Sequence, residues 1–260
     1  MAGFLLKIRR GETPFYKGLR KTAQGILEAN LPTPSFLKPF FRFLYNFHFA
    51  VLEVVQGMIT FFYREPLFRA RCTSAGRHLK LYRLPEIYGH TSIHIGEHVS
   101  FTGVAAITSG RFLDQPTLII KDRAIIGHQV LISVNKEVII EEDVMIANNC
   151  SVTDNDGHPR AMDLRIQHVP LTDRDIRPVR ICRGAWLGRG VQVMKGVTIG
   201  EGAIIGANSV VIFDIPPYAL AMGNPAEVVM RGAGKPSKRP APPEAPKFQE
   251  VQRTNVAPQE

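Results

Sequence analysis

An aliphatic residue stands at every sixth position through one stretch of this chain, and no other feature of the sequence restricts the fold as much. The six positions are Ile181, Leu187, Val193, Ile199, Ile205 and Val211. A period of six is neither the period of about 3.6 residues of an α-helix nor the simple alternation of a β-strand. Glycine directly follows three of these aliphatic residues, and a small residue beside a buried side chain suits a chain that turns a corner there. Three such corners complete one triangular coil, so the pattern predicts a parallel β-helix whose stacked coils bury an aliphatic column.

The same period extends back to Ile93 with interruptions and predicts three earlier coils. Their buried corners are Ile95, Phe101 and Ile107, then Ile120, Ile126 and Ile132, and then Ile140, Ile146 and Val152. With the two regular coils this makes about five coils, and at least three repeats are usually needed for stable stacking. The predicted fold class is therefore an all-β core, preceded by an α-helical N-terminal segment and followed by a disordered tail.

Charge and composition divide the chain into three parts. Residues 1–90 contain fourteen Lys and Arg against five Asp and Glu, whereas the two counts are equal in the rest of the chain. Nine of the fifteen phenylalanines lie between Phe36 and Phe68. We therefore predict a basic, Phe-rich helical segment over residues 1–90, the hexapeptide-repeat domain over residues 91–231, and a Pro-rich disordered tail over residues 232–260.

The Phe-rich stretch predicts a helix over residues 36–64 with one broad apolar face. A membrane-spanning helix needs about 20 uninterrupted apolar residues, and Arg42, His48 and Glu53 interrupt this one. Two interpretations stay open: the face packs against the β-helix or a neighbouring subunit, or it lies on a membrane surface. The basic charge alone would also suit nucleic acid, but the Phe content and the lack of a recognised binding module disfavour that partner.

Cysteine usage and the N-terminus indicate the compartment. The three cysteines are Cys72, Cys150 and Cys182, an odd and widely spaced set that argues against a disulfide framework and fits a reducing environment. The apolar run at the N-terminus is too short for the core of a signal peptide. We therefore expect a cytoplasmic protein, either free or peripheral at the inner face of the cytoplasmic membrane.

The candidate site lies where the period breaks, between Thr153 and Arg180. Functional residues are often inserted at such breaks, because the regular coils are needed for the core. The break opens with three polar residues, Asp154, Asn155 and Asp156, followed by His158. Histidine titrates near neutrality, so it can take up and release a proton at working pH. The alternative is an ordinary surface-loop histidine among turn-forming residues.

Several short motifs recur along the chain in one order. That order closely resembles the hexapeptide-repeat O-acetyltransferases of the maltose, galactoside and surface-polysaccharide type, over roughly residues 93–231. The motifs are His158-Pro159, Pro178-Val179, Ala185-Trp186-Leu187-Gly188, Lys195 to Gly200, Gly206 to Val211, Asp214 to Pro217 and Gly223 to Ala226.

The resemblance implies a left-handed β-helix and a homotrimer with active sites between subunits. It implies acetyl-CoA as donor, a hydroxyl of a sugar or saccharide precursor as acceptor, and no metal. His158 matches the family's catalytic base. The resemblance implies Trp186 and Asn135 as acceptor-binding residues, and we expect the polar loop residues Asp154, Asn155 and Asp156 to bind the acceptor as well. The implied CoA-binding residues are Gly188, Arg189, Ala207, Ile212 and Arg231.

The sequence departs from the family pattern at the phosphate contacts of CoA. Ile212-Phe213 stands where the family usually has a Thr-Lys pair, and Glu227 and Met230 occupy positions that are commonly basic. The resemblance therefore leaves Arg231, Lys195 or a basic N-terminal residue to hold the nucleotide end of CoA.

Two other functions are weighed against acyl transfer. A zinc enzyme of the carbonic-anhydrase type shares the repeat but needs three converging histidines, and His90, His94, His98 and His128 do not have that spacing. A non-catalytic scaffold would use the β-helix only for assembly, and His158 in its polar loop argues against it.

Overall fold

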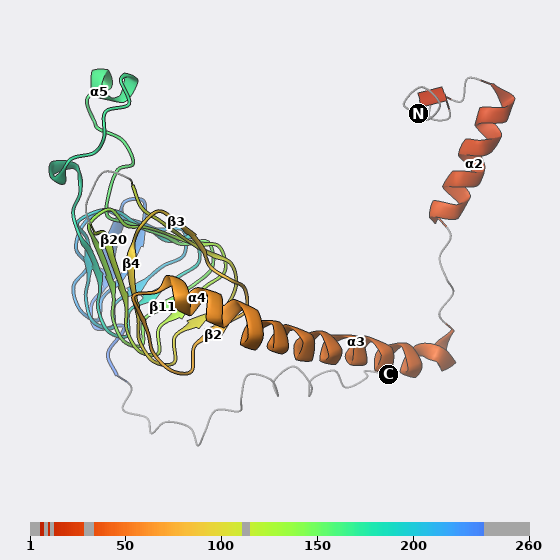
Figure 1. The fold of residues 1–260 in the computed structure, drawn as a ribbon, viewed down its shortest axis with the longest axis horizontal. Coiled ribbons are helices and arrows are strands. Elements are labelled where there is room, and N and C mark those ends of the chain that lie inside the picture. Colours follow the sequence, from red (N-terminus) through yellow and green to blue (C-terminus); the bar gives the residue numbers. More distant parts are fainter. Residues whose placement is uncertain (1–5, 8–9, 11–12, 29–33, 111–114, 237–260) are drawn as a thin grey trace. The chain divides into compact units, whose positions relative to one another are not determined.

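The computed structural model describes residues 6–7, 10, 13–28, 34–110 and 115–236 (Figure 1). Most of the predicted tail, residues 237–260, lies outside the described residues. The chain forms two units, with the boundary between Val55 and Gln56.

From Ser74 onward the chain winds as a left-handed parallel β-helix, as the six-residue period predicts. Each coil contributes one short strand to each of three sheets. The first sheet contains β1 (Ser74–Ala75), β4 (Ser92–Ile95), β7 (Thr117–Ile120), β10 (Glu137–Ile140), β13 (Val179–Ile181) and β16 (Thr198–Ile199). The second contains β2 (Lys80–Leu81), β5 (Ser100–Phe101), β8 (Ile125–Ile126), β11 (Met145–Ile146), β14 (Trp186–Leu187), β17 (Ile204–Ile205), β19 (Leu220–Gly223) and β20 (Ala226–Met230). The third contains β3 (Glu86–Tyr88), β6 (Ala105–Thr108), β9 (Val130–Ser133), β12 (Ser151–Thr153), β15 (Gln192–Val193) and β18 (Val210–Val211).

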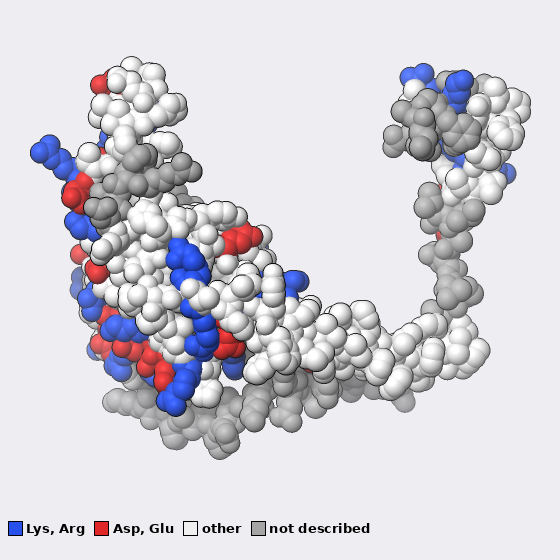
Figure 2. Space-filling view, viewed as in Figure 1, with Lys and Arg blue, Asp and Glu red and all other residues white. Residues whose placement is uncertain are grey.

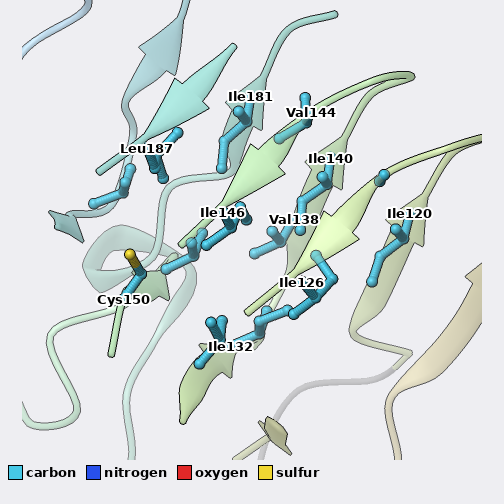
Figure 3. Packing of buried hydrophobic residues seen from close by; sticks show 14 of the residues in the cluster. Ile120, Ile126, Ile132, Val138, Ile140, Val144, Ile146, Cys150, Ile181 and Leu187 are labelled. Carbon is cyan, nitrogen blue, oxygen red and sulfur yellow. The ribbon is translucent and has the colours of Figure 1, made fainter. Parts of the chain in front are cut away.

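The aliphatic column fills the centre of the coils (Figure 3). In the first sheet Ile120 pairs with Ile140, which pairs in turn with Ile181. In the second sheet Ile126 pairs with Ile146. All five side chains are at most 1% exposed. Burying one such side chain contributes about 1.5–3 kcal/mol relative to leaving it exposed, so the in-register column is the main source of stability in the coils.

The structure adds one coil to the five that the sequence predicts. Strands β1 to β3 form this coil, and it lies before Thr91, where the predicted repeat domain begins. Its inward residues Ala75, Leu81 and Ile87 keep the six-residue spacing and pair with the corners of the next coil, Ile95, Phe101 and Ile107. The six-residue pattern did not predict this coil, because its first inward residue is an alanine instead of a large aliphatic residue.

Two short helices close the N-terminal end of the stack. They are η2 (Thr60–Arg64) and α4 (Glu65–Arg71). The ring of Phe68 is buried and meets the ring of Phe101 edge to face, with ring centroids 5.5 Å apart. Phe68 therefore plugs the open end of the aliphatic column.

Arginines satisfy the backbone carbonyl groups that the first coil would otherwise leave unpaired. Arg69 donates to the carbonyl oxygens of Ala75 and Gly76 at 3.0 and 2.8 Å. Arg64 donates in the same way to the Tyr82 carbonyl oxygen of the first coil, at 3.0 Å. Buried carbonyl groups need such partners, so these arginines belong to the fold of the β-helix as well as to the basic charge of the N-terminal segment.

Replacing Phe68 by Ala should lower the free energy of unfolding by about 3–5 kcal/mol, because the substitution opens a cavity at the end of the column. Phe61→Ala is the matched control, since the Phe61 side chain is 68% exposed, and it should change that free energy by about 0.5 kcal/mol or less. Urea unfolding of the two variants measures both quantities. Similar losses for the two would contradict the role of Phe68 as a plug.

The other described elements lie outside the stacked coils. They are α2 (Pro14–Glu28), η1 (Ser35–Leu37), α3 (Lys38–Ile59), α5 (Met162–Ile166) and η3 (Asp173–Asp175). Helix α3 contains no buried residue, so no described residue buries its predicted apolar face. No helix among the described residues combines the length and the apolar character that crossing a membrane requires.

Candidate active site

The break in the period becomes a loop over residues 154–178 that projects from the coils and carries α5 (Figure 1). The two ends of this loop lie side by side. Asn155 and Ile176 form an antiparallel bridge, and the Arg177 N–H donates to the Asp154 carbonyl oxygen at 2.9 Å. The loop therefore leaves and re-enters the β-helix through one narrow neck, which fixes the position of the residues just beyond it.

The Asp154 carboxylate organises this neck. It is fully buried and accepts hydrogen bonds from three successive backbone N–H groups, those of Asn135, Lys136 and Glu137, at 2.6–3.0 Å. The side-chain amide of Asn155 donates to it at 2.9 Å. Removing such an acceptor would leave several buried donors unsatisfied, which is costly. The Asp154 carboxylate, which we expect from the sequence to bind the acceptor, is thus engaged with the backbone of residues 135–137.

A tight turn then presents the histidine. The Gly157 N–H donates to Asn155 Oδ1 at 2.9 Å, and Gly157 has φ +76°, a left-handed conformation that glycine adopts without strain. Pro159 is buried, whereas His158 between them is exposed. The turn and the anchored proline thus hold the imidazole at the surface, where no hydrogen bond from a described residue occupies it.

His158 lines a cavity of about 180 Å³. Asn135 and Gly110 form one side of the cavity, and His168 with residues 169–171 forms the other. Asn135 accepts a hydrogen bond from the Gly110 N–H through Oδ1 at 2.6 Å, and its amide NH₂ has no acceptor among the described residues. The cavity therefore combines an exposed imidazole, an amide donor and an apolar wall. Sequence reasoning did not single out His168, whose only signal was its place in the loop.

Lys195 joins the start of the loop to its end. Its Nζ lies 2.6 Å from Asp156 Oδ2 and donates to the Asp175 carbonyl oxygen at 2.6 Å. Burial raises the pKa of Asp156, but the hydrogen bonds from Lys195 and Arg160 outweigh burial, and the pKa lies below its usual value. Lys195 is therefore engaged in the neck and is not free to bind the CoA phosphates. Its partners lie twenty or more residues away in the sequence, so the sequence alone could not show that Lys195 connects the two ends of the loop.

Trp186 and the expected CoA-binding residues lie elsewhere on the chain. Trp186 is on β14, faces outward and is 48% exposed. Gly188 follows the same strand, and a Cβ atom there would come within 2.8 Å of the Ala207 backbone nitrogen, so glycine lets these two turns stack closely. Arg189 is in that turn too, whereas Ile212 follows β18 and Arg231 follows β20. Among the described residues, no hydrogen bond, ion pair or ring contact links this group to His158, and none of its members lines the cavity.

The histidines considered for a zinc site do not converge. His128 Nδ1 accepts a hydrogen bond from the Val104 N–H at 3.1 Å, and His98 stacks on His78 with ring centroids 4.5 Å apart. No three His, Cys, Asp or Glu side chains of the described part of the chain come together as metal ligands.

Comparison with known proteins identifies the repeat. Residues 178–212 match the family described as "Bacterial transferase hexapeptide (six repeats)". The Saccharomyces cerevisiae protein YJL218W, whose name proposes an acetyltransferase activity, is 35% identical over 118 residues, or 45% of this chain. The chain spans only 58% of the length of that relative.

Solved structures share the fold. The N-acyltransferase AntD from Bacillus cereus, in complex with dTDP-4-amino-4,6-dideoxyglucose and coenzyme A, has 15% identity and a TM-score of 0.50, covering 65% of this chain and 89% of AntD. A maltose O-acetyltransferase from Clostridium difficile 630 has 27% identity and a TM-score of 0.39, covering 65% of this chain and 74% of its own. Beyond the fold, the similarity of this chain is to the hexapeptide-repeat transferases over residues 178–212 and to the yeast relative over 118 residues.

Proposed function

We propose that this hexapeptide-repeat β-helix protein is a CoA-dependent acyltransferase that moves an acetyl group from acetyl-CoA to a hydroxyl of a sugar or saccharide precursor. The observation that carries the proposal is the exposed imidazole of His158 at a cavity, held there by the buried Asp154 network. The comparisons support the coarser part of it, acyl transfer by a hexapeptide-repeat protein. The acceptor and the choice of oxygen as nucleophile rest on the motif resemblance.

His158 acts as the general base in the proposed reaction. Its unprotonated ring nitrogen takes the proton of the acceptor hydroxyl as the oxygen attacks the thioester carbonyl carbon. The C–S bond then breaks, and the imidazolium returns the proton to the CoA thiolate. The NH₂ group of Asn135 is placed to donate to an acceptor oxygen in the same cavity, and Asn155 and Asp156 hold the turn from which His158 projects.

We propose that a homotrimer completes the site. Within one chain, Trp186 and the expected CoA-binding residues lie apart from His158, so a cleft containing both needs a neighbouring subunit. The second sheet offers an outward apolar row for such a contact, because Ile125, Met145 and Trp186 stack in register and are each more than a third exposed. Sedimentation of the full chain should therefore show three chains per particle, and an active monomer would contradict this assembly.

CoA would lie along the turns that contain Gly188, Arg189 and Ala207. Ile212 would contact the same arm, and Arg231 supplies a positive charge for the phosphates, since it makes no ion pair among the described residues. Backbone groups in tight turns suit the pantetheine arm because side chains there are small, and a guanidinium suits phosphate.

The test is turnover of acetyl-CoA by the full chain with a panel of saccharide acceptors. Release of the free CoA thiol should depend on the acceptor, and the product should gain one acetyl group. Cleavage of that group by hydroxylamine identifies an ester, whereas resistance identifies an amide and would place this chain with the N-acyltransferases. No turnover of a CoA thioester with any acceptor would favour the non-catalytic scaffold.

We also propose that residues 1–90 bring the enzyme to a membrane surface as a peripheral protein. The supporting observation is the basic charge of this segment together with the exposed apolar residues of α3. At such a surface a lipid-linked saccharide would be a suitable acceptor.

A further inference from the structure

Helix α2 has two chemically opposite faces. Phe15, Leu19 and Ala23 follow one another at intervals of four residues and lie on one face, exposed. Lys17 and Lys21 lie on the opposite face, also exposed, and make no ion pair among the described residues. The helix has no acidic residue in its first turn. A short helix with an apolar face opposite a basic face is the usual form of an in-plane membrane-surface helix.

We propose that α2 binds anionic phospholipid headgroups and that α3 supplies the apolar insertion that holds the protein on the same leaflet. The inference deepens the proposed membrane contact by assigning its lipid chemistry, and it does not depend on the proposed acyl transfer.

Helix α3 has a different surface from α2. Arg42, Asn46 and Glu53 form one narrow polar stripe on α3, and the rest of its circumference is apolar except for His48. Phe43 and Val54 on the apolar side are each more than 60% exposed. The face of α3 visible in Figure 2 is almost wholly free of charged residues.

A shallow apolar groove also runs along α3. It is lined by Phe41, Leu44, Tyr45, Phe47, His48 and Val51. A groove of this composition suits lipid acyl chains, and α3 would lie within the leaflet with its polar stripe toward the headgroups, since no described helix can span the bilayer.

A lipid surface fits these helices better than a second copy of the chain. The apolar part of α3 is much wider than the stripe that pairing with one other helix would cover. The excess of eight basic over three acidic residues in the first 55 residues would repel the same segment of another copy but is complementary to an anionic leaflet. In this proposal α2 makes the protein prefer anionic lipids, and α3 inserts into the apolar part of the leaflet.

The test is flotation of the full chain with two kinds of vesicle, pure phosphatidylcholine and phosphatidylcholine containing about one-third phosphatidylglycerol. The full chain should bind both and bind the anionic vesicles more tightly. The double variant Lys17→Gln/Lys21→Gln should bind the anionic vesicles about 30-fold more weakly, because each basic residue near the surface contributes roughly fivefold. Its binding to pure phosphatidylcholine should not change.

A matched control removes the same charge elsewhere. Arg174→Gln/Lys235→Gln changes two side chains outside residues 1–90 that are exposed and make no ion pair among the described residues, and it should leave binding to both vesicles unchanged. Equal effects of the two double variants would overturn the role of α2, because net charge alone would then explain the binding. A full chain that stays unbound with both vesicles would overturn the lipid partner itself. Turnover of acetyl-CoA without vesicles is measured on the same preparation, so a failure of this inference is distinguished from a failure of the proposed reaction.

Discussion

Replacing His158 by Ala is expected to lower the catalytic constant for acyl transfer by at least about 100-fold, because a positioned general base contributes about 10²–10⁴-fold. The side chain is exposed and makes no hydrogen bond with a described residue, so its removal opens no cavity and breaks no network. The variant should therefore unfold at the same denaturant concentration as the parent chain. The measurement is the rate of thiol release from acetyl-CoA at saturating acceptor, together with urea unfolding.

His98→Ala is the matched control for this substitution. His98 is also exposed, but it lies at a turn between β4 and β5, in the second coil, and the variant should keep near-parental turnover. A His158→Ala variant that kept turnover within about threefold of the parent would remove this residue from the mechanism, since the loss would be far below that of a general base. Loss of turnover in both variants would point to an effect unrelated to the site.

The coils could be predicted because the fold repeats one local rule. Every inward position, such as Ile140 or Ile146, faces the same environment as the equivalent position of the next coil, so the same kind of residue recurs at a fixed interval. The first coil escaped prediction where Ala75 weakened that signal, even though its spacing is regular. The place of the loop was equally predictable, because it interrupts the repeat.

The roles of individual polar residues within the loop were not predictable in the same way. Sequence reasoning grouped Asp154 with the acceptor-binding residues, and the structure turns its carboxylate inward onto the backbone of residues 135–137. Whether such a side chain points inward depends on strand register, here on Thr153 pairing with Ser133. Lys195 likewise acquires its role from partners that only the stacked coils bring near it. The repeat pattern predicts where each coil lies, whereas the contacts of Asp154 and Lys195 depend on how the coils stack.

The second large effect is expected from Asp154→Asn, which should lower both the stability of the chain and its turnover. Asp154 Oδ1 accepts from the Asn135 N–H and the Asn155 amide, and Oδ2 accepts from the N–H groups of Lys136 and Glu137 as well. An asparagine side chain replaces one of these oxygens by an NH₂ group. If the NH₂ group replaces Oδ2, the N–H groups of Lys136 and Glu137 lose their acceptor. If it replaces Oδ1, the Asn155 amide loses its acceptor, whereas the Asn135 N–H keeps Oδ2. At least one buried donor is therefore left unsatisfied in either orientation.

Asp154→Asn should therefore lower the free energy of unfolding by about 3 kcal/mol, since hydrogen bonds to a buried charged acceptor are worth about 1.5–3 kcal/mol each and unsatisfied donors add to the loss. The catalytic constant should fall by at least about tenfold, because small displacements of a positioned base are costly. Both Asn135 and the turn that presents His158 depend on this carboxylate. The control is Asp163→Asn in α5 of the same loop, because the Asp163 side chain is exposed and makes no hydrogen bond to another described residue.

Hydrogen exchange distinguishes this mechanism from a general loss of stability. In Asp154→Asn the backbone amides of Asn135, Lys136 and Glu137 should exchange faster than in the parent chain, while the hydrogen-bonded amides of a coil farther along the stack, such as those of Ile204 and Gly206, stay protected. Asp163→Asn should change neither set. If the three amides kept their parental protection and turnover stayed within about twofold, the carboxylate would not be what holds the neck. Faster exchange confined to these amides, with turnover reduced, would show that the buried acid positions the base without touching the substrate.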